Sequence, residues 1–281
     1  MIPRSLSSAA RRRPASIVVL AVLALASGCS SNGSLRDQIS ARKEIGALRA
    51  AFLQETEAST RAVLSDQDDS SVAAVNDARA AAARVVAANA GLRARLQTLG
   101  YAKEAALLGE FETAYQEYAA LETDVLRLAV ENSNTKARRL SVADGQRAAD
   151  ALFAALDRVP GLGADDAAVR AAVVELQLIE LRHIMEPDDA AMAAMESRMD
   201  QLAARARAPL TARGSAAADS AQALDAFLAV HAEVMALSRR NTDLKGLALT
   251  LGRKRVVAAA CADTLAALDE ALAGHGTEAT R

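Results

Sequence analysis

The chain contains an internal repeat, and this repeat constrains its fold more than any other feature. Residues 128–141 share the pattern L-x-x-x-N-[ST]-[ND]-x-K-x-x-x-L-[ST] with residues 237–250, an offset of 109 positions. Farther upstream, Arg61 and Asp68-Asp69 match Arg182 and Asp188-Asp189, with offsets of 121 and 120. The offset is 109 for the first motif but 120 or 121 for the second, because the copies differ by an insertion or deletion between these motifs. The sequence therefore predicts two copies of one structural unit.

The spacing of apolar residues predicts that each unit is helical. Between Leu107 and Leu128 the apolar positions follow one another in alternating steps of four and three, which is typical of a coiled-coil seam. Aromatic residues make up only 2% of a chain that is 52% hydrophobic, whereas strands favour aromatic and β-branched residues. We therefore predict an all-α protein with two tandem antiparallel four-helix bundles, produced by internal duplication and preceded by a lipoprotein signal peptide.

Helix breakers and polar turns set the expected boundaries. Val159-Pro160-Gly161-Leu162-Gly163 is the strongest interruption and separates the copies. The helices are expected near 36–66, 69–98, 102–132 and 134–158, and then near 164–186, 188–210, 215–240 and 243–273. The predicted organisation is a signal peptide at 1–28, a lipidated tether at 29–35, one bundle at 36–159, a linker at 160–163, a second bundle at 164–273 and a flexible tail at 274–281.

The N-terminal segment indicates export and a lipid anchor. Four arginines without an acidic residue precede ten apolar residues at 17–26, which is too short for a membrane span and typical of a signal peptide. Leu25-Ala-Ser-Gly-Cys29 resembles the lipobox of bacterial lipoproteins. This resemblance implies cleavage after Gly28, lipid on Cys29 and a periplasmic location, with Ser30 favouring the outer membrane. The alternative is an ordinary signal peptide followed by an incidental cysteine.

Two segments carry a wider resemblance. The sequence from Arg182 to Arg198, with its Pro-Asp-Asp turn, resembles the turn between the first two helices in the four-helix sensor domain of methyl-accepting chemotaxis receptors. Residues 137–152 are similar to the start of the fourth helix of those domains. The resemblance implies a periplasmic sensing or binding module. The chain lacks the two membrane spans and the cytoplasmic coiled coil of such receptors. Because the receptor domains work as dimers, two fused copies could form an intramolecular pseudo-dimer.

The candidate ligand-binding residues are polar groups at repeated positions near the predicted helix ends. Arginine suits bidentate recognition of a carboxylate, and the receptor family uses arginines of its first helix in this way; for Arg61 the alternative is an ion pair with Glu57. Each repeated asparagine could fix the helix register, cap the next helix or contact a ligand. Each repeated lysine could neutralise an anion or be solvated. The complete set is Arg61, Arg182, His183, Asn132, Asn241, Lys136 and Lys245.

Other features are assigned structural roles. Cys261 falls on an apolar seam and is expected to be a buried, inert thiol. Residues 252–255, Gly-Arg-Lys-Arg, are expected to form a solvated basic face. Glu180 and His183 have the Glu-x-x-His spacing of di-iron bundles, but the first copy lacks the second half of such a site. We expect no metal, no cofactor and no catalytic residues, and the net charge of −2 gives no indication of nucleic-acid binding.

Two functions are compatible with these observations. The first is a non-enzymatic, lipid-anchored periplasmic module that binds a small carboxylate or amino acid, or relays sensing to a partner protein. The second is a structural or protein-interaction lipoprotein of the cell envelope without a small-molecule ligand. A polar pocket at the helix tips would favour the first function. An exposed apolar stripe along a helix would favour the second.

Overall fold

A computed structural model describes the backbone of residues 16–278 and the side chains of residues 36–275. Every regular element in the described backbone is helical, which confirms the predicted all-α class. The elements are α1 (Ser16–Leu64), α2 (Asp68–Leu99), α3 (Ala102–Glu131), α4 (Ser133–Leu140), the π-helical segment η1 (Ser141–Gly145), α5 (Gln146–Leu156), α6 (Ala164–Ile184), α7 (Asp189–Arg213), the 3₁₀ segment η2 (Gly214–Ala217), α8 (Ala218–Arg240), α9 (Thr242–Leu249), the π-helical segment η3 (Thr250–Lys254) and α10 (Arg255–Glu278).

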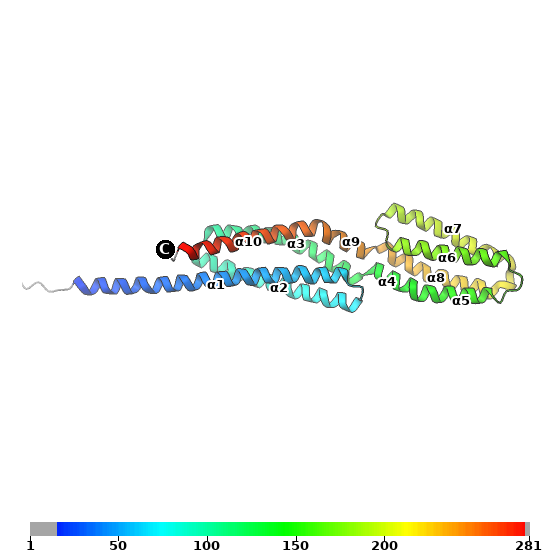
Figure 1. Cartoon of the computed structure of the whole chain (residues 1–281), viewed down its shortest axis with the longest axis horizontal. Helices are drawn as coiled ribbons and strands as arrows, with labels where there is room; N and C mark the ends of the chain where they lie inside the picture. The colour runs from blue at the N-terminus through cyan, green and yellow to red at the C-terminus, as the bar shows by residue number, and fades with distance from the viewer. Residues whose placement is uncertain (1–15, 279–281) are drawn as a thin grey trace, which may run out of the picture.

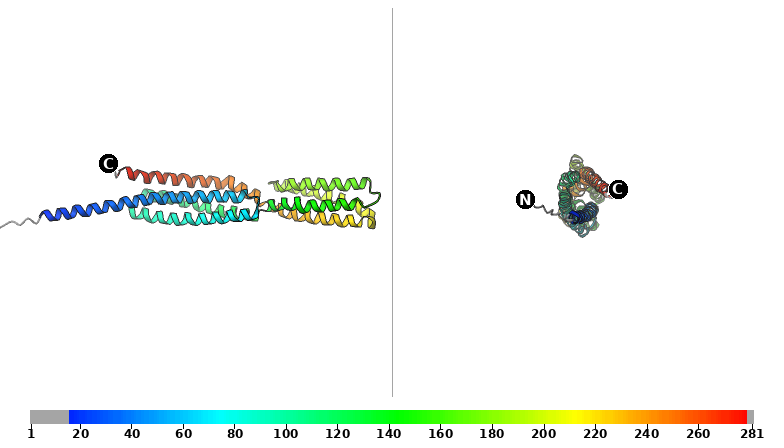
Figure 2. Two further views of the ribbon diagram at one scale, coloured as in Figure 1. Left: turned by 60° about the horizontal axis from the view of Figure 1, so that its bottom comes forward. Right: turned by 90° about the vertical axis from the view of Figure 1, so that its left-hand side faces the viewer.

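The helices form two bundles that are stacked end to end in a rod (Figure 1, Figure 2). In the basal bundle, α1, α2 and α3 pack with α9 and α10. In the distal bundle, α4 and α5 pack with α6, α7 and α8. The start of α1 and the end of α10 lie toward the same end of the rod (Figure 1). We call the region where the two bundles meet the waist.

This grouping differs from the expected one, in which each run of four consecutive helices forms its own bundle. The fourth helix of the first copy, α4–α5, belongs to the distal bundle, and the fourth helix of the second copy, α9–α10, returns to the basal bundle. The reason lies in the connections. Only Asn132 separates α3 from α4, and only Asn241 separates α8 from α9, whereas helix connections in bundles usually take 2–8 residues. The polar segment at 132–134 is therefore not the reversing turn that we expected.

Each bundle has its own apolar core. The seam of α3 lies in the basal core, where Phe111, Tyr118 and Val125 are fully buried. Cys261 of α10 is also fully buried, as predicted, and burial raises the pKa of its thiol to about 12. The distal core is formed by a separate cluster of residues from α5, α6, α7 and α8. The spacing of apolar residues therefore predicts correctly which helix faces are buried. The apolar faces of α5 and α10, however, pack in the bundle that consists mainly of helices from the other copy.

Several helix ends differ from the expected boundaries. Pro209 lies inside α7 rather than at its end, and the helix continues to Arg213. The buried side chain of Leu210 packs into the distal core and stabilises this last turn. At the C-terminus, α10 extends to Glu278, so residues 274–278 are helical rather than a loose tail. Gly100 ends α2 in the left-handed conformation, with φ +68°, as the predicted break requires.

The N-terminal predictions fall largely outside the described residues. Residues 1–15 are not described, and the backbone of residues 16–28 continues α1. The side chain of Cys29 is also outside the described set. Within the described residues, none of the helices has the length and apolar character needed to cross a bilayer. The signal peptide, the tether and the lipid anchor therefore stay predictions.

Candidate functional site

The two repeated asparagines end α3 and α8 at the waist. Asn132 has φ +47° and Asn241 has φ +55°, and they are the two non-glycine residues with positive φ in the described chain. Both side chains are almost fully buried, with 4% and 2% of their surface exposed. Asparagine adopts this conformation more readily than most other residues. Each asparagine is therefore the C-cap of the helix that it ends. Neither asparagine side chain caps the helix that follows, which was the capping role that we expected.

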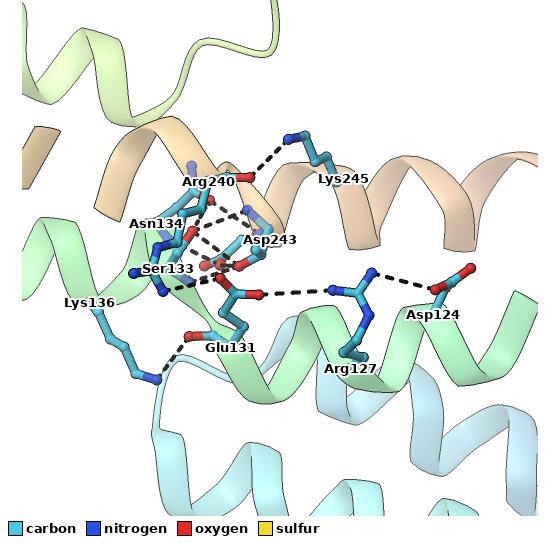
Figure 3. Close-up of polar contacts among 10 residues, drawn as sticks. Asp124, Arg127, Glu131, Ser133, Asn134, Lys136, Arg240, Asp243 and Lys245 are labelled. Carbon is cyan, nitrogen blue, oxygen red and sulfur yellow. Dashed lines mark hydrogen bonds and ion pairs between the residues drawn. The ribbon is translucent and has the colours of Figure 1, made fainter. Parts of the chain in front are cut away.

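The caps of those following helices come from the other copy. The backbone N–H of Ser133 donates to Thr242 Oγ1 at 2.9 Å, and the N–H of Thr242 donates to Ser133 Oγ at 3.1 Å. The N–H of Asn134 donates to Asp243 Oδ1 at 3.1 Å, and the N–H of Asp243 donates to Asn134 Oδ1 at 3.2 Å. All four bonds join positions that are 109 residues apart. The first turns of α4 and α9 thus cap each other reciprocally (Figure 3).

The repeated lysines neutralise helix ends in this structure. Lys136 Nζ donates to the backbone carbonyl of Glu131 at 2.8 Å, and Lys245 Nζ donates to that of Arg240 at 2.9 Å (Figure 3). Both carbonyls are in the last turn of a helix, where cations are stabilised by the helix dipole. The two lysines therefore have protein partners at equivalent places in the two copies.

The buried amides join α6 to the waist. Asn134 Nδ2 donates to Asn241 Oδ1 at 2.8 Å and to the carbonyl of Ile184 at 2.6 Å. Asn241 Nδ2 donates to the carbonyl of Glu186 at 3.0 Å. Asn132 Nδ2 donates to Asp68 Oδ1 at 3.3 Å. These polar groups are satisfied by protein partners, so the waist fixes the register between the two bundles.

Arg182 and His183 are adjacent in sequence but lie in different environments. Arg182 is exposed near the end of α6, and no ion pair of its side chain is found among the described residues. His183 is fully buried; its Nδ1 lies 2.8 Å from Ser238 Oγ and its Nε2 lies 3.1 Å from Glu196 Oε1. Burial lowers the pKa of this imidazole, although Glu196 acts in the opposite direction. The site formed by His183 is therefore internal to the distal bundle.

Arg61 lies on the wall of a surface hollow between α1 and α2. The hollow has a volume of about 660 Å³ and is lined by Gln54, Thr56, Glu57, Ala58, Thr60, Arg61, Asp77, Ala80 and Arg84. Arg61 Nη2 lies 3.0 Å from Asp77 Oδ2, and both side chains are 64% exposed. The partner of Arg61 is thus Asp77 of α2 rather than Glu57. Arg84 Nη2 donates to Gln54 Oε1 at 3.0 Å. We call this feature the α1–α2 hollow.

The sequence interpretation missed a group of buried charges in the basal bundle. Lys254 is 2% exposed and forms an ion pair with Glu122, which is 4% exposed and also accepts a hydrogen bond from Ser59 Oγ at 2.8 Å. The expectation that residues 252–255 form a solvated face is wrong for Lys254. The error arose because the partners lie on α1 and α3, far from Lys254 in sequence. No local pattern signals such a pair.

A second buried carboxyl lies close to this pair. Glu55 is 1% exposed and accepts a hydrogen bond from Tyr115 Oη at 2.9 Å. Burial raises the pKa of Glu55 to about 7. In the distal bundle, the positions equivalent to Ser59 and Glu122 hold Glu180 and His231, whose side chains lie 2.5 Å apart. Groups of three or more metal-ligating side chains are absent from the described part of the chain.

The comparisons with known proteins place part of this architecture in a family. Residues 35–170 match the family model of the four helix bundle sensory module for signal transduction. This confirms, for that part of the chain, the predicted resemblance to the sensor domain of chemotaxis receptors. Sensory modules of this kind are periplasmic, which is consistent with an envelope location. The chain matches none of the curated proteins and none of the solved structures with which it was compared.

The match also locates the hollow within the sensory part of the chain. The matched residues comprise α2, α3, α4 and α5, all of the described side chains of α1, and the start of α6. Every residue that lines the α1–α2 hollow falls between positions 54 and 84, inside the matched range. The Arg182 region and the waist contacts of α9 lie outside it.

Proposed function

We propose that the protein is a lipid-anchored sensory module of the cell envelope, and that it binds a free amino acid or another small carboxylate in the α1–α2 hollow. The observation that carries the proposal is the arrangement of charges around the hollow. Two arginines, Arg61 and Arg84, and two acids, Glu57 and Asp77, line it. A free amino acid carries both signs of charge and complements this set better than a dicarboxylate does.

The contacts that hold these arginines are weak enough for a ligand to replace. Exposed ion pairs such as Arg61–Asp77 contribute about 0–1 kcal/mol to stability. A carboxylate that accepts two parallel hydrogen bonds from a guanidinium gains more than such a pair does. The ligand's ammonium group would then interact with Glu57 or Asp77. We infer that ligand binding exchanges exposed protein contacts for better-oriented ones.

The test is a thermal-shift screen of the purified full chain with amino acids, dicarboxylates and simple amines. A ligand at 100 times its Kd stabilises the native state by about 2.7 kcal/mol, which corresponds to a rise in Tm of about 5–10 °C for a protein of this size. We expect amino acids to give the shift, and Arg61→Ala and Arg84→Ala to abolish it. Arg182→Ala is the matched control, because it removes an exposed arginine outside the hollow. A shift that persists in Arg61→Ala, or its absence with every compound, would contradict the proposal.

The second candidate function is a structural or protein-interaction lipoprotein, and one observation favours it. Large apolar side chains on α6 and directly after it are exposed, among them Leu178 of α6 at 58% and Met185, the residue that follows the helix, at 74%. Exposed apolar surface of this kind is typical of sites that contact another protein or a membrane. A screen without any shift would favour this second function.

A further inference from the structure

A cavity in the basal bundle contains two buried carboxylates. It lies between α1, α2 and α3 and has a volume of about 200 Å³. Its lining includes Glu55, Tyr115 and Glu122, and alanines and one leucine form its apolar wall. Its lining residues all differ from those of the α1–α2 hollow. A single water needs only about 10–15 Å³ of such space, so this cavity, which we call the carboxylate cavity, admits a larger guest.

One carboxylate oxygen of this lining lacks a partner. Glu122 is 4% exposed, and its Oε2 accepts a hydrogen bond from Ser59 Oγ at 2.8 Å and pairs with Lys254. The other oxygen, Oε1, is buried without a hydrogen-bond partner among the described residues. Buried polar atoms are almost always hydrogen-bonded, because an unpaired one is unfavourable. A guest that donates a hydrogen bond to Glu122 Oε1 would remove this cost.

The charges around the cavity are also unbalanced. Glu55 is 1% exposed, and its Oε2 accepts a hydrogen bond from Tyr115 Oη at 2.9 Å. Lys254 compensates one of the two carboxylates. When both carboxylates are ionised, one negative charge is left in the low-dielectric interior, which is unfavourable. A monovalent cation would neutralise it.

The distal bundle shows that the repeated fold does not require this cavity. Three leucines occupy the equivalent places there, and all of them pack in the distal core. At offsets of 121 and 109 they are Leu176 for Glu55, Leu224 for Tyr115 and Leu228 for Ala119. One copy of the unit thus fills with apolar side chains the place where the other copy has a carboxyl group, a phenol and a cavity.

We propose that the carboxylate cavity binds the ammonium group of a short primary alkylamine. An ammonium group has three donors, which can reach Glu122 Oε1 and the carboxylate of Glu55, while the alkyl chain packs against the apolar wall. Ca²⁺ fits less well, because it takes 6–8 oxygen ligands and the cavity is lined by two carboxylates. An α-amino acid is disfavoured, since its own carboxylate would lie beside those of Glu55 and Glu122. The inference does not rest on the ligand proposed for the α1–α2 hollow.

The groups that face Glu55 come from every helix packed around it. They are Arg79 of α2, Tyr115, Tyr118 and Glu122 of α3, Lys254 of η3 and Cys261 of α10. Burial raises the pKa values of the two tyrosines and of Cys261, so these three groups stay protonated between pH 6 and 8. The side chain of Arg79 is exposed, so that water and salt screen its charge.

Amine binding should therefore depend on pH through Glu55. Burial raises the pKa of Glu55 to about 7; the hydrogen bond from Tyr115 and the charge of Lys254 act in the opposite direction, and the charge of Glu122 adds to the rise. The ionised fraction of Glu55 grows about tenfold from pH 6 to pH 8, while an alkylamine stays protonated over this range. Because the ammonium group favours ionised Glu55, its affinity should rise by about the same factor.

Isothermal titration calorimetry of the purified full chain with n-butylammonium chloride tests the proposal. We expect saturable binding at pH 8 that is about tenfold weaker at pH 6. Glu55→Gln keeps the shape of the side chain and an acceptor for Tyr115 but removes the charge, so it should weaken binding at pH 8 by at least about tenfold and abolish the pH dependence. Ala119→Leu introduces the residue of the distal bundle and should prevent binding by filling the cavity. Glu110→Gln, which alters an exposed acid of α3, is the matched control and should bind as the unmodified chain does.

The control compounds separate the charge from the alkyl chain. n-Butanol has the chain without the charge, and K⁺ has a charge without the chain. Binding of n-butanol as tight as that of butylammonium would show a merely apolar cavity, and equally tight binding of K⁺ would show a site for inorganic cations; either result would overturn the proposal. The absence of butylammonium binding at two temperatures would show that the cavity holds only water. Unchanged binding in both Glu55→Gln and Ala119→Leu would place the amine elsewhere, and the proposal would fail.

Arg61→Ala separates this site from the α1–α2 hollow. Butylammonium should bind this variant as it binds the unmodified chain, because Arg61 does not line the carboxylate cavity. The thermal shift that we expect from amino acids should be lost in the same variant. The two proposals can therefore fail independently of each other.

Discussion

Replacing Lys254 by Met should strongly destabilise the basal bundle. The ammonium group of Lys254 is an ion-pair partner of Glu122, donates to Ser59 and lies 5.3 Å from the centroid of the Tyr118 ring. Glu122 Oε1 is buried and has no hydrogen-bond partner among the described residues. Methionine keeps the length of the side chain but removes the cation. The Glu122 carboxylate then stays buried without its countercharge.

The expected loss follows from the burial of both partners. Breaking a buried ion pair by removing one member costs about 3–5 kcal/mol, because the remaining charge is uncompensated. For a protein of this size, 1 kcal/mol corresponds to about 2–4 °C, so Tm should fall by about 6–20 °C. Lys103→Met, which alters an exposed lysine of α3 in the same bundle, should change stability by less than about 0.5 kcal/mol.

The assay is thermal unfolding followed by circular dichroism, combined with hydrogen exchange to localise the effect. Because the protein has two bundles, hydrogen exchange should accelerate in α3 and α10 much more than in α6 and α7. Adding Glu122→Gln to Lys254→Met should restore most of the lost stability, since no buried charge is then left unpaired. A loss below about 1 kcal/mol in Lys254→Met, or no recovery in the double variant, would refute the reasoning.

Two further predictions concern Glu55 and the waist. The folded-state pKa of Glu55, about 7, exceeds its ordinary value of 4.5, so the contribution of Glu55 to the free energy of unfolding decreases as the pH rises from about 4.5 to 7. Between pH 5 and 8, the free energy of unfolding of the unmodified chain should fall by roughly 2–3 kcal/mol relative to that of Glu55→Gln. Comparing urea unfolding of the two proteins cancels the opposite trend from His183, and parallel pH profiles would contradict the assignment. Asp243→Ala removes acceptors for the backbone N–H groups of Asn134 and Thr135 and should cost about 1–2 kcal/mol in the same assay; the same loss in Asp200→Ala, an exposed position of α7, would show that capping is not the cause.

The sequence by itself determined the local structure of this protein. The alternating spacing of apolar residues places Phe111, Tyr118 and Val125 on a buried helix face, because side chains three and four positions apart lie on one side of a helix. The same reasoning placed Cys261 in the core. The repeated asparagines marked helix ends correctly, since few other residues adopt the left-handed conformation.

The candidate site was predictable only in part. Arg61 was identified from its repeated position near a helix end, and it does line the α1–α2 hollow. Its neighbour Arg84 was not identified, because it lies on α2 and approaches the hollow only through the packing of two helices. His183 was grouped with the ligand-binding residues, but its contacts with Glu196 and Ser238 enclose it within the distal bundle.

The tertiary structure alone decided which helices share a bundle. Helices α4–α5 and α9–α10 carry similar apolar faces because the units are repeated, so each could fill the fourth place in either bundle. The one-residue connections at Asn132 and Asn241 decide between these arrangements, since so short a link does not let the chain reverse. The reciprocal caps between Ser133 and Thr242 then fix the crossing, through bonds across 109 residues. Local spacing specifies that a face is buried, whereas the identity of its partner depends on contacts between distant parts of the chain.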